Sequence, residues 1–399
     1  MKIVNIEDYF HPEAGYQINI LPKYMAKMGH EVTIITSEMD KIPTELISFF
    51  GCDDIEKKDK EYMEQSGVKI IRLPLHAFIS GRAVFFEKIL FKTIKIENPD
   101  IVYVHGNDTL TGMQYLLKRK KMNYPLVMDS HMLEMASKNK LNKAFRRVYR
   151  CFFTPIIIKD KIQVIRTQDD PYVEKALGIP LTQAPWISYG SDTMLFHPDE
   201  AVKKKFRTEN GIGDNDFVVV YTGKLDESKG GKLLAETFRK KFNTRKNIVL
   251  VVVGSTAGAY GKEVDKLFAE SENRIIRFPT RRYSDLPRFY QSADLSVFAK
   301  QCSLSFYDAQ ACGLPVLSED NNINIDRCGH NNGWNFKSDN AEDFRKKIEA
   351  AADMNDGDYR AISDNAYKFI IENYNYEDKA REYENVILNV INNEKGRME

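Results

Sequence analysis

The sequence lacks any long hydrophobic run. No apolar stretch approaches the roughly 20 residues that a membrane-spanning helix needs, and the opening MKIVNIEDYF reaches charge too early for a secretory signal peptide. Only five of the 399 residues are cysteine, without the spacing of metal ligands, which argues against a disulfide framework and indicates a reducing compartment. We therefore expect a cytoplasmic protein, and one that is able to rest on the inner face of the cell membrane.

The chain also lacks an excess of either charge. Its 58 basic and 57 acidic residues give a formal net charge of +1 at pH 7, so the whole molecule is not drawn to nucleic acid or to anionic membrane. Hydrophobic residues make up 43% and charged residues 29%, a balance typical of a globular protein. Because 399 residues exceed one ordinary core, two domains are expected.

Short apolar runs alternate with helical patterns through both halves of the chain. Runs of this length, buried on both faces, are typical of parallel strands in a doubly wound α/β sheet. A stretch rich in Gly, Asp and Pro at residues 190–198 separates the two series. The expected strands are residues 2–6, 31–37, 68–73, 101–105, 126–128 and 162–165 in the first half, and 217–222, 248–253, 275–278, 295–298 and 315–317 in the second.

The most informative stretch is ADLSVFAKQCSLSFYDAQACGLPVLSED, residues 293–320. It predicts a buried strand, a polar loop, and a helix whose start is marked by Ser303 and Ser305 and whose end is the Cys-Gly-Leu-Pro sequence. Serines before an apolar helical run are good caps, and the free amides behind them favour an anion. Asp308 adds a carboxylate near the same end. Taken alone, the stretch fits an ordinary strand-to-helix crossover equally well.

A glycine-bearing loop with two lysines follows the first strand of the second series. Lys224 and Lys229 in GKLDESKGG are spaced to place two cations beside a diphosphate. A solvated lysine-rich loop is the alternative. A P-loop is excluded, because Asp226 stands where its first glycine is required and Leu233 stands where Ser or Thr must follow the lysine.

Other motifs are weaker. The GSTAG sequence at 254–258 departs from the dinucleotide fingerprint spacing, and the Asp-Asn-Asp sequence at 214–216 precedes a strand, so we assign it to a turn. His105 and His131 each follow a buried strand, where a histidine is able to face a ligand. Gly15, in the loop after the first strand, permits close approach of backbone to a ligand or simply forms a turn.

Residues 138–150 predict a basic amphipathic helix, with Phe152 and Phe153 extending its apolar side. Such a helix is able to lie on anionic lipid. Packing of its apolar face against the sheet explains the same pattern equally well.

Four stretches, in order along the chain, resemble the motifs of retaining glycosyltransferases of the GT-B fold, in particular the large sugar-nucleotide-dependent family 4. The resemblance covers nearly the whole chain. Ala14 replaces one of the family's paired glycines, and Lys224 replaces its arginine. The four stretches are residues 11–36 with their Gly-His-Glu-Val sequence, the hinge WISYGSDTMLFHPD at 186–199, VVYTGKLDESKG at 219–230, and residues 293–318.

This resemblance implies an α/β protein with two Rossmann-like, doubly wound parallel-sheet domains facing a central cleft. Residues 1–195 would form the acceptor-side domain, 196–375 the nucleotide-sugar-binding domain, and 376–399 a helix packing back on the first. It implies a hexosyl- or related transferase of the EC 2.4 class, which moves a sugar with retention from a nucleotide-diphosphate donor to a glycan or lipid-linked saccharide acceptor in polysaccharide biosynthesis. No metal, other cofactor or nucleic acid is expected.

The resemblance also implies roles for single residues. Lys224 and Lys229, in the loop that begins at Gly223, would hold the donor's diphosphate and stabilise charge on the leaving group. His131 matches the histidine near the donor sugar, and Gly15 lies where the family's first loop approaches the phosphates. The catalytic set predicted from the sequence is therefore His131, Lys224 and Lys229.

Around Asp308 the chain departs from the family. Asp308 aligns with the second glutamate of the Glu-x7-Glu motif and would bind the ribose, but Lys300 stands where the first glutamate would face the donor sugar. Gln301 or Ser303 would occupy that space. The exchange excludes a double displacement through that residue and leaves a front-face reaction, in which the leaving phosphate takes the acceptor's proton. The amides expected to contact the diphosphate or sugar belong to Ser303, Leu304, Ser305 and Phe306.

Two other functions remain open from the sequence. The missing glutamate also fits a catalytically silent sugar-nucleotide-binding protein. A GT-B-fold sugar-nucleotide epimerase is the third hypothesis, although its acidic and histidine pattern is not seen.

Overall fold

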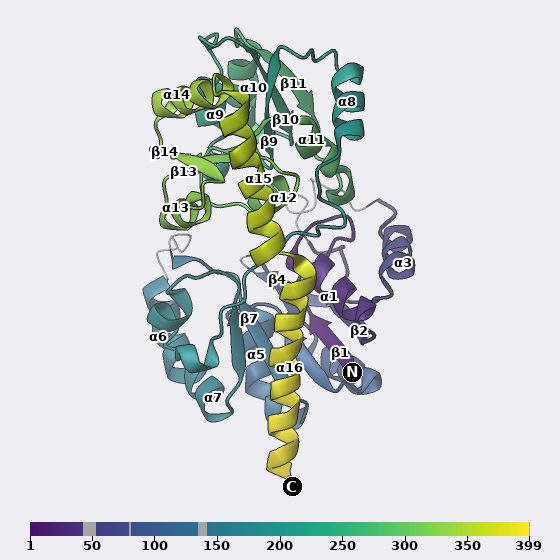
Figure 1. Ribbon diagram of the computed structural model, residues 1–399. Helices are drawn as coiled ribbons and strands as arrows, with labels where there is room; N and C mark the ends of the chain where they lie inside the picture. The colour runs from purple at the N-terminus through teal and green to yellow at the C-terminus, as the bar shows by residue number, and fades with distance from the viewer. Residues whose placement is uncertain (43–52, 80, 135–141, 399) are drawn as a thin grey trace. The chain divides into compact units, whose positions relative to one another are not determined.

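The computed structural model describes residues 1–42, 53–79, 81–134 and 142–398 (Figure 1). It forms two compact units, one made of Met1–Tyr189 with Tyr376–Glu399 and the other of Gly190–Asn375. Residues 190–195, which the sequence analysis assigned to the first domain, cluster with the second unit in the structure.

Unit 1 is built on a six-stranded parallel sheet in the order β3-β2-β1-β6-β7-β8. The inner strands are short and almost wholly buried, as expected of a sheet covered on both faces, whereas the edge strands β3 and β8 are only partly buried. A separate antiparallel pair, β4 (Leu75–Ile79) and β5 (Arg82–Phe85), was not expected from the sequence. The sheet strands are β1 Lys2–Ile6, β2 Glu31–Ser37, β3 Lys69–Leu73, β6 Ile101–Val104, β7 Leu126–Ser130 and β8 Gln163–Arg166.

The helices of unit 1 connect these strands, and they enclose a core of aliphatic and aromatic side chains. The last helix, α16, lies against α1 and returns the end of the chain to this unit. His30 lies 2.6 Å from Glu384 of α16, and Tyr24 stacks on Tyr376 with ring centroids 5.5 Å apart. The helices are α1 Gln17–Lys27, α3 Ile55–Ser66, α4 Glu87–Glu97, α5 Leu110–Lys118, α6 Asn142–Phe152, α7 Thr154–Lys159 and α16 Tyr376–Met398.

Unit 2 repeats the plan with a parallel sheet in the order β11-β10-β9-β12-β13-β14. Its strand β10, NIVLVVV, pairs with β9 and β11 and is buried from its second residue onward. The five strands expected in this half are all present, and β14 is an addition. They are β9 Asp216–Thr222, β10 Asn247–Val253, β11 Arg274–Phe278, β12 Leu295–Phe298, β13 Val316–Glu319 and β14 Gly333–Phe336.

The helices of unit 2 cover both faces of this sheet. Their apolar sides form a second core, separate from that of unit 1. They are α8 Glu200–Glu209, α9 Gly231–Thr237, α10 Gly258–Ala269, α11 Pro287–Ser292, α12 Ser305–Ala311, α13 Asn322–Cys328, α14 Ala341–Ala352 and α15 Asp356–Asn373.

Both sheets have the strand order 3-2-1-4-5-6 when their strands are counted along each unit. In such sheets ligands bind beyond the carboxyl ends of the strands, at the point where the order reverses. That point lies between β1 and β6 in unit 1 and between β9 and β12 in unit 2. The predicted doubly wound sheets are confirmed, and they define two edges at which to look for a site.

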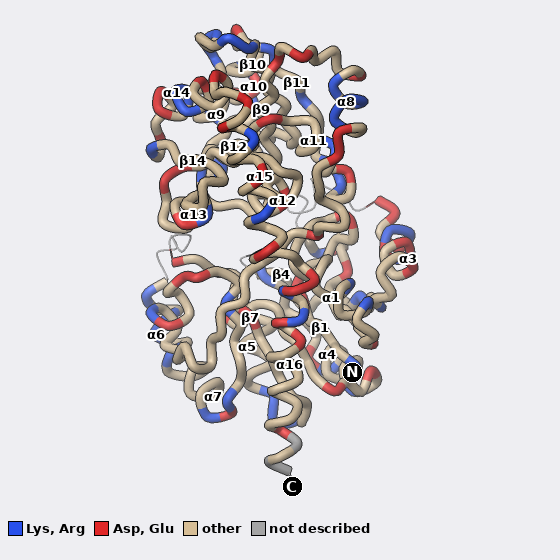
Figure 2. The backbone as a smooth tube through the Cα atoms, viewed as in Figure 1, with Lys and Arg blue, Asp and Glu red and all other residues tan. Residues whose placement is uncertain are grey.

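Charge is spread evenly over each unit. Figure 2 shows Lys and Arg interspersed with Asp and Glu along the chain, in keeping with the formal net charge of +1. None of the helices within the described residues is long and apolar enough to cross a membrane.

Candidate active site

A glycine at the start of the loop after β9 lies in close contact with a glycine at the end of β10. Gly223 has a φ of 139°, and its amide donates to the carbonyl of Val253 at 3.0 Å. A Cβ on Gly254, at the end of β10, would lie 1.9 Å from the carbonyl oxygen of Gly223. The first glycine of the GSTAG sequence is therefore required for packing between two neighbouring strand ends.

The two-lysine loop then turns back onto the segment after β12. Asp226 accepts a hydrogen bond from the amide of Lys229 at 3.0 Å, which closes a short turn. At Gly230, where φ is 72°, a Cβ would meet the Cβ atoms of Lys300 at 3.0 Å and Ala299 at 3.2 Å. The loops that follow β9 and β12 are thus packed against each other at the reversal point of the sheet.

Lys229 joins these two loops directly. Its Nζ donates to the carbonyl of Cys302 at 3.2 Å. Burial lowers its pKa, whereas Cys302, Asp226 and Glu319 favour the charged form. Lys224 has an exposed side chain, and its carbonyl accepts from the hydroxyl of Tyr221 at 2.6 Å. The structure therefore brings Lys229 together with residues 299–304 and leaves Lys224 at the surface of the same loop.

The segment from 299 to 304 is held in a strained conformation. Gln301 has a φ of 59°, in the left-handed region that residues with a side chain seldom adopt. Its amide donates to Oε1 of Glu319, and its carbonyl accepts from Nδ2 of Asn324 at 3.3 Å. Arg327 donates to the carbonyl of Ser303 at 3.1 Å. Three side chains from β13 and α13 therefore fix this loop.

The start of α12 differs from the expectation of serine caps. The helix begins at Ser305, its N-cap residue Leu304 has helical dihedrals, and no side chain caps it. Ser303 Oγ accepts from the amide of Ser305 at 3.3 Å, and the carbonyl of Ser303 accepts from the amide of Phe306 at 3.4 Å. The amides of Ser305 and Phe306 therefore donate to Ser303 within the same segment. A turn, and not a side-chain cap, leads into α12. The contact of these amides with a donor remains a prediction.

Asp308 is 5% exposed and lies inside α12. Its Oδ1 accepts from the hydroxyls of Ser191 at 2.7 Å and Tyr283 at 3.1 Å. Burial raises the pKa of Asp308 to about 7, against the opposing effect of these hydrogen bonds. Lys300 instead points to the exposed Asp339, with Nζ 3.1 Å from its Oδ1. The ribose-binding role of Asp308 stays a prediction.

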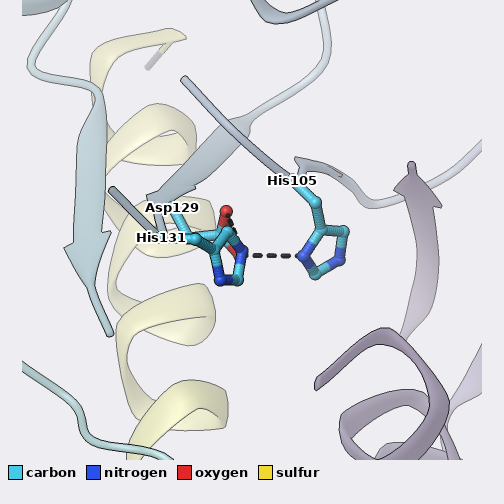
Figure 3. A group of neighbouring side chains, drawn as sticks. All are labelled: His105, Asp129 and His131. Atoms are coloured by element: carbon cyan, nitrogen blue, oxygen red, sulfur yellow. Dashed lines mark hydrogen bonds and ion pairs between the residues drawn. The ribbon is translucent and has the colours of Figure 1, made fainter. Parts of the chain in front are cut away.

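At the reversal point of unit 1, three side chains form an ionisable cluster in which His105 and Asp129 are buried and His131 is exposed (Figure 3). Nδ1 of His105 lies 2.8 Å from Oδ2 of Asp129, and Nε2 of His131 lies 2.9 Å from Oδ1 of the same carboxylate. The amide of Gly106 also donates to Asp129, at 2.7 Å. The ends of β6 and β7 therefore converge on one fully buried carboxylate.

The second nitrogen of each imidazole is engaged too. Nε2 of His105 lies 3.1 Å from Oδ1 of Asn5, and Nδ1 of His131 contacts the hydroxyl of Tyr189. Burial opposes charge on His131, but Asp129 and then Tyr189 outweigh it and raise the pKa of His131 well above its ordinary value. Both ring nitrogens of His131 are therefore engaged, and its neighbours favour the protonated form.

The same three side chains offer a ligand set for a metal ion, since one donor atom from each lies within 4.8 Å of the others. Nδ1 of His105 and Nε2 of His131 already lie at hydrogen-bond distance from the carboxylate. The arrangement is satisfied as a hydrogen-bonded ion pair, so no metal role is assigned to it.

Two further sequence predictions concern Gly15 and the Asp-Asn-Asp sequence at residues 214–216. Gly15 lies in the loop before α1 and does not adopt a positive φ, so a close backbone approach there is left as a prediction. Asp216 accepts from the amide of Gly213 at 2.7 Å and from Asn247 at 3.1 Å. Asp214 and Asn215 lie in the predicted turn, and Asp216 is the first residue of β9.

Sequence reasoning missed four residues of these two sites, namely Glu7, Asp129, Tyr189 and Glu319. Glu7 directly follows β1, close to His105 and Asp129, and burial raises its pKa to about 7. Two of them, Glu7 and Glu319, carried a readable signal: each is an acidic residue at the carboxyl end of an apolar strand.

Comparison with known proteins defines the class to which this geometry corresponds. Residues 202–369, somewhat less than half of the chain, match the family model described as Glycosyl transferases group 1. A protein named probable sucrose-phosphate synthase from Thermosipho melanesiensis is 23% identical over 94% of this chain and 91% of its own length. These matches support a group 1 glycosyltransferase.

Solved structures add the fold. A glycosyltransferase from Rickettsia africae superposes with a TM-score of 0.77 at 15% identity, covering 98% of both chains. HepE from Anabaena, solved in complex with UDP and glucose, superposes with a TM-score of 0.74 at 16% identity over 98% of this chain and 100% of its own. These likenesses confirm the predicted GT-B fold, with two parallel-sheet α/β domains.

Proposed function

We propose that the protein is a retaining, metal-independent glycosyltransferase that moves a sugar from a nucleotide-diphosphate donor to a glycan or lipid-linked saccharide. The observation that carries the proposal is the pair of loops joined by Lys229 and Cys302 at the reversal point of unit 2. The family match spans both loops. UDP-glucose is the first donor to test, because HepE was solved with it.

In this mechanism Lys224 and Lys229 bind the diphosphate and stabilise the charge that develops on it. The bond between the sugar's anomeric carbon and the diphosphate oxygen breaks, and a bond to the acceptor oxygen forms on the same face. The proton of the acceptor hydroxyl passes to the departing diphosphate. The lysine charges are already in place, so they stabilise the departing diphosphate without any rearrangement of the site during the reaction. His131 completes the proposed catalytic set, because the family resemblance implies a role for it near the donor sugar.

The test is a transfer assay on the full chain. UDP-glucose, GDP-mannose and ADP-glucose are supplied with saccharide and lipid-linked saccharide acceptors, and the product's anomeric configuration is read by proton NMR. The proposal expects a product with the donor's α configuration. An inverted product would contradict the retaining assignment, and the absence of turnover with every pair would contradict the transferase itself.

A catalytically silent sugar-nucleotide-binding protein is the second candidate. The pairing of Lys300 with Asp339 favours it, since the position expected to supply a carboxylate supplies a cation turned to an exposed partner. Nucleotide binding without turnover of any donor would support this candidate, and measured turnover would exclude it.

The acceptor is proposed from the relatives. WaaG, a glycosyltransferase involved in lipopolysaccharide biosynthesis, shares the fold and supports a lipid-linked saccharide. Relatives named D-inositol 3-phosphate glycosyltransferase support a phosphorylated polyol as the competing acceptor class. Both classes therefore belong in the acceptor panel.

A further inference from the structure

A buried carboxylate closes β13 beside the proposed donor loops. Glu319 is the last residue of this strand and is 7% exposed. Its Oε1 accepts from the amide of Gln301, and more weakly from Nδ2 of Asn321 at 3.4 Å. Within the described residues, Oε2 of Glu319 accepts no hydrogen bond.

The position of Glu319 in the sheet is informative. Strands β9, β12 and β13 are neighbours, and their carboxyl ends carry, in that order, the two-lysine loop, the segment 299–304 and Glu319. The charge of Glu319 acts on both Lys229 and Lys300, favouring the protonated form of each. The carboxylate thus belongs to the same edge as the cations proposed to bind the diphosphate.

The contact between Glu319 and Gln301 holds the backbone of Gln301 in a strained conformation. Gln301 holds its left-handed conformation while its amide is bound by Glu319 and its carbonyl by Asn324. Strained backbone of this kind persists where the surroundings over-determine it, often at ligand sites. Oε1 of Glu319 orders the loop, and Oε2 accepts no hydrogen bond from the residues that the structure describes.

We propose that Glu319 binds a hydroxyl group of the donor sugar through Oε2 and thereby supplies the carboxylate that Lys300 does not. This inference rests on the proposed glycosyltransferase function and adds a specificity-determining residue to it. A carboxylate accepts hydrogen bonds from hydroxyl groups and repels a second anion, so the site selects neutral hydroxylated sugars over uronic acids.

The discriminating variant is Glu319→Gln. The amide oxygen of glutamine still accepts from the amide of Gln301, so the loop is retained while the negative charge is lost. We expect kcat/KM for the donor to fall at least about tenfold, the loss typical of a hydrogen bond to a charged group. The Kd of the matching nucleoside diphosphate, which has no sugar to contact Glu319, stays within about twofold.

Two further variants complete the experiment. Glu319→Ala also removes the support of Gln301, so it weakens both the donor and the nucleoside diphosphate. Asp339→Asn removes an exposed acid that pairs with Lys300 and leaves both constants unchanged.

Equal losses for donor and diphosphate in Glu319→Gln would overturn the inference in favour of a purely structural role, and so would no loss in either. A wild-type chain that binds none of UDP, GDP and ADP overturns the proposed function, and this inference with it. A wild-type chain that turns over its donor while Glu319→Gln is unaffected overturns only the inference.

Discussion

At the scale of single residues, the proposed role of Lys229 predicts that its charge strengthens the binding of a diphosphate. The variant Lys229→Met keeps the aliphatic packing and removes the cation that reaches Cys302. We expect the affinity for UDP to fall by about 2 kcal/mol, in the range for a hydrogen bond to a charged group. Isothermal titration measures the loss, and the melting temperature reports whether the fold is retained.

Lys232 provides the matched control for this experiment. It lies three residues further along and pairs with Glu263 on α10. Lys232→Met should bind UDP as the wild type does. If Lys232→Met loses as much affinity for UDP as Lys229→Met, the loss comes from the net positive charge of the loop. The prediction of a specific role for Lys229 is then wrong.

Asp308 makes the stability of unit 2 depend on pH. Its pKa is raised by burial to about 7 in the folded protein, above the roughly 3.9 of an unfolded aspartate. The folded state therefore binds this proton more tightly. The resulting stability is fully present below about pH 4 and is lost as the pH rises to about 7, by up to about 4 kcal/mol.

The variant Asp308→Asn tests this dependence, because its amide oxygen still accepts from Ser191 and Tyr283. Urea unfolding between pH 4.5 and 8 should give a flatter profile than the wild type, with a gain in stability at pH 8. Asp214→Asn, in an exposed turn, is the control and should follow the wild type. A variant less stable than the wild type at pH 8 would show that Asp308 is ionised and stabilising.

Residue roles were only partly predictable. Lys229 could be identified because glycine and lysine spacing describes a loop locally. The partners of His131 could not, since Asp129 and Tyr189 meet it only after β7 and the hinge have folded. The position of Glu319 at the end of an apolar strand was readable from the sequence, but its contact with Gln301, 18 residues away, was not.

At the scale of elements, strand positions followed from the sequence wherever both faces of a strand are buried. Continuous apolar runs such as that of β10 are unmistakable. The short strands β4, β5 and β14 are only partly buried and lack such a run. Their pairing comes from tertiary contacts, which no local pattern records.

Helix α6 is the described part of the basic amphipathic segment, whose residues 138–141 lie outside the described chain. Tyr149 is buried, and Phe145 packs against the core. Val148 and Phe152 are 50% and 64% exposed, beside the exposed Lys143 and Arg147. One face of the helix thus packs on unit 1, and another presents apolar and basic groups to the surroundings.

Membrane association through α6 is tested by reversing two charges. The double variant Lys143→Glu with Arg147→Glu should reduce flotation with phosphatidylglycerol liposomes, since each basic residue contributes about 1 kcal/mol at an anionic surface. Arg150 is a poor choice, because its guanidinium donates to Ala176 and Lys175. The control is Lys57→Glu with Lys60→Glu on α3, and equal flotation of both double variants would contradict the assignment to α6.

At the scale of the whole molecule, the two units have the same strand order but present different chemistry at their reversal points. Unit 1 collects a buried acid and two imidazoles, and unit 2 collects lysines and a strained loop. The fold could be predicted because the alternation of strands and helices repeats twice. The identities of sugar and acceptor could not, because they depend on the shape of a site that no single motif encodes.

The most direct test of the central claim is the binding of nucleoside diphosphates by the full chain. Thermal shift with UDP, GDP and ADP should raise the melting temperature for at least one of them, by several degrees at saturating concentration. The Lys224→Met, Lys229→Met double variant should lose that shift while keeping its own melting transition. Unchanged melting of the wild-type chain with all three nucleotides would contradict the account.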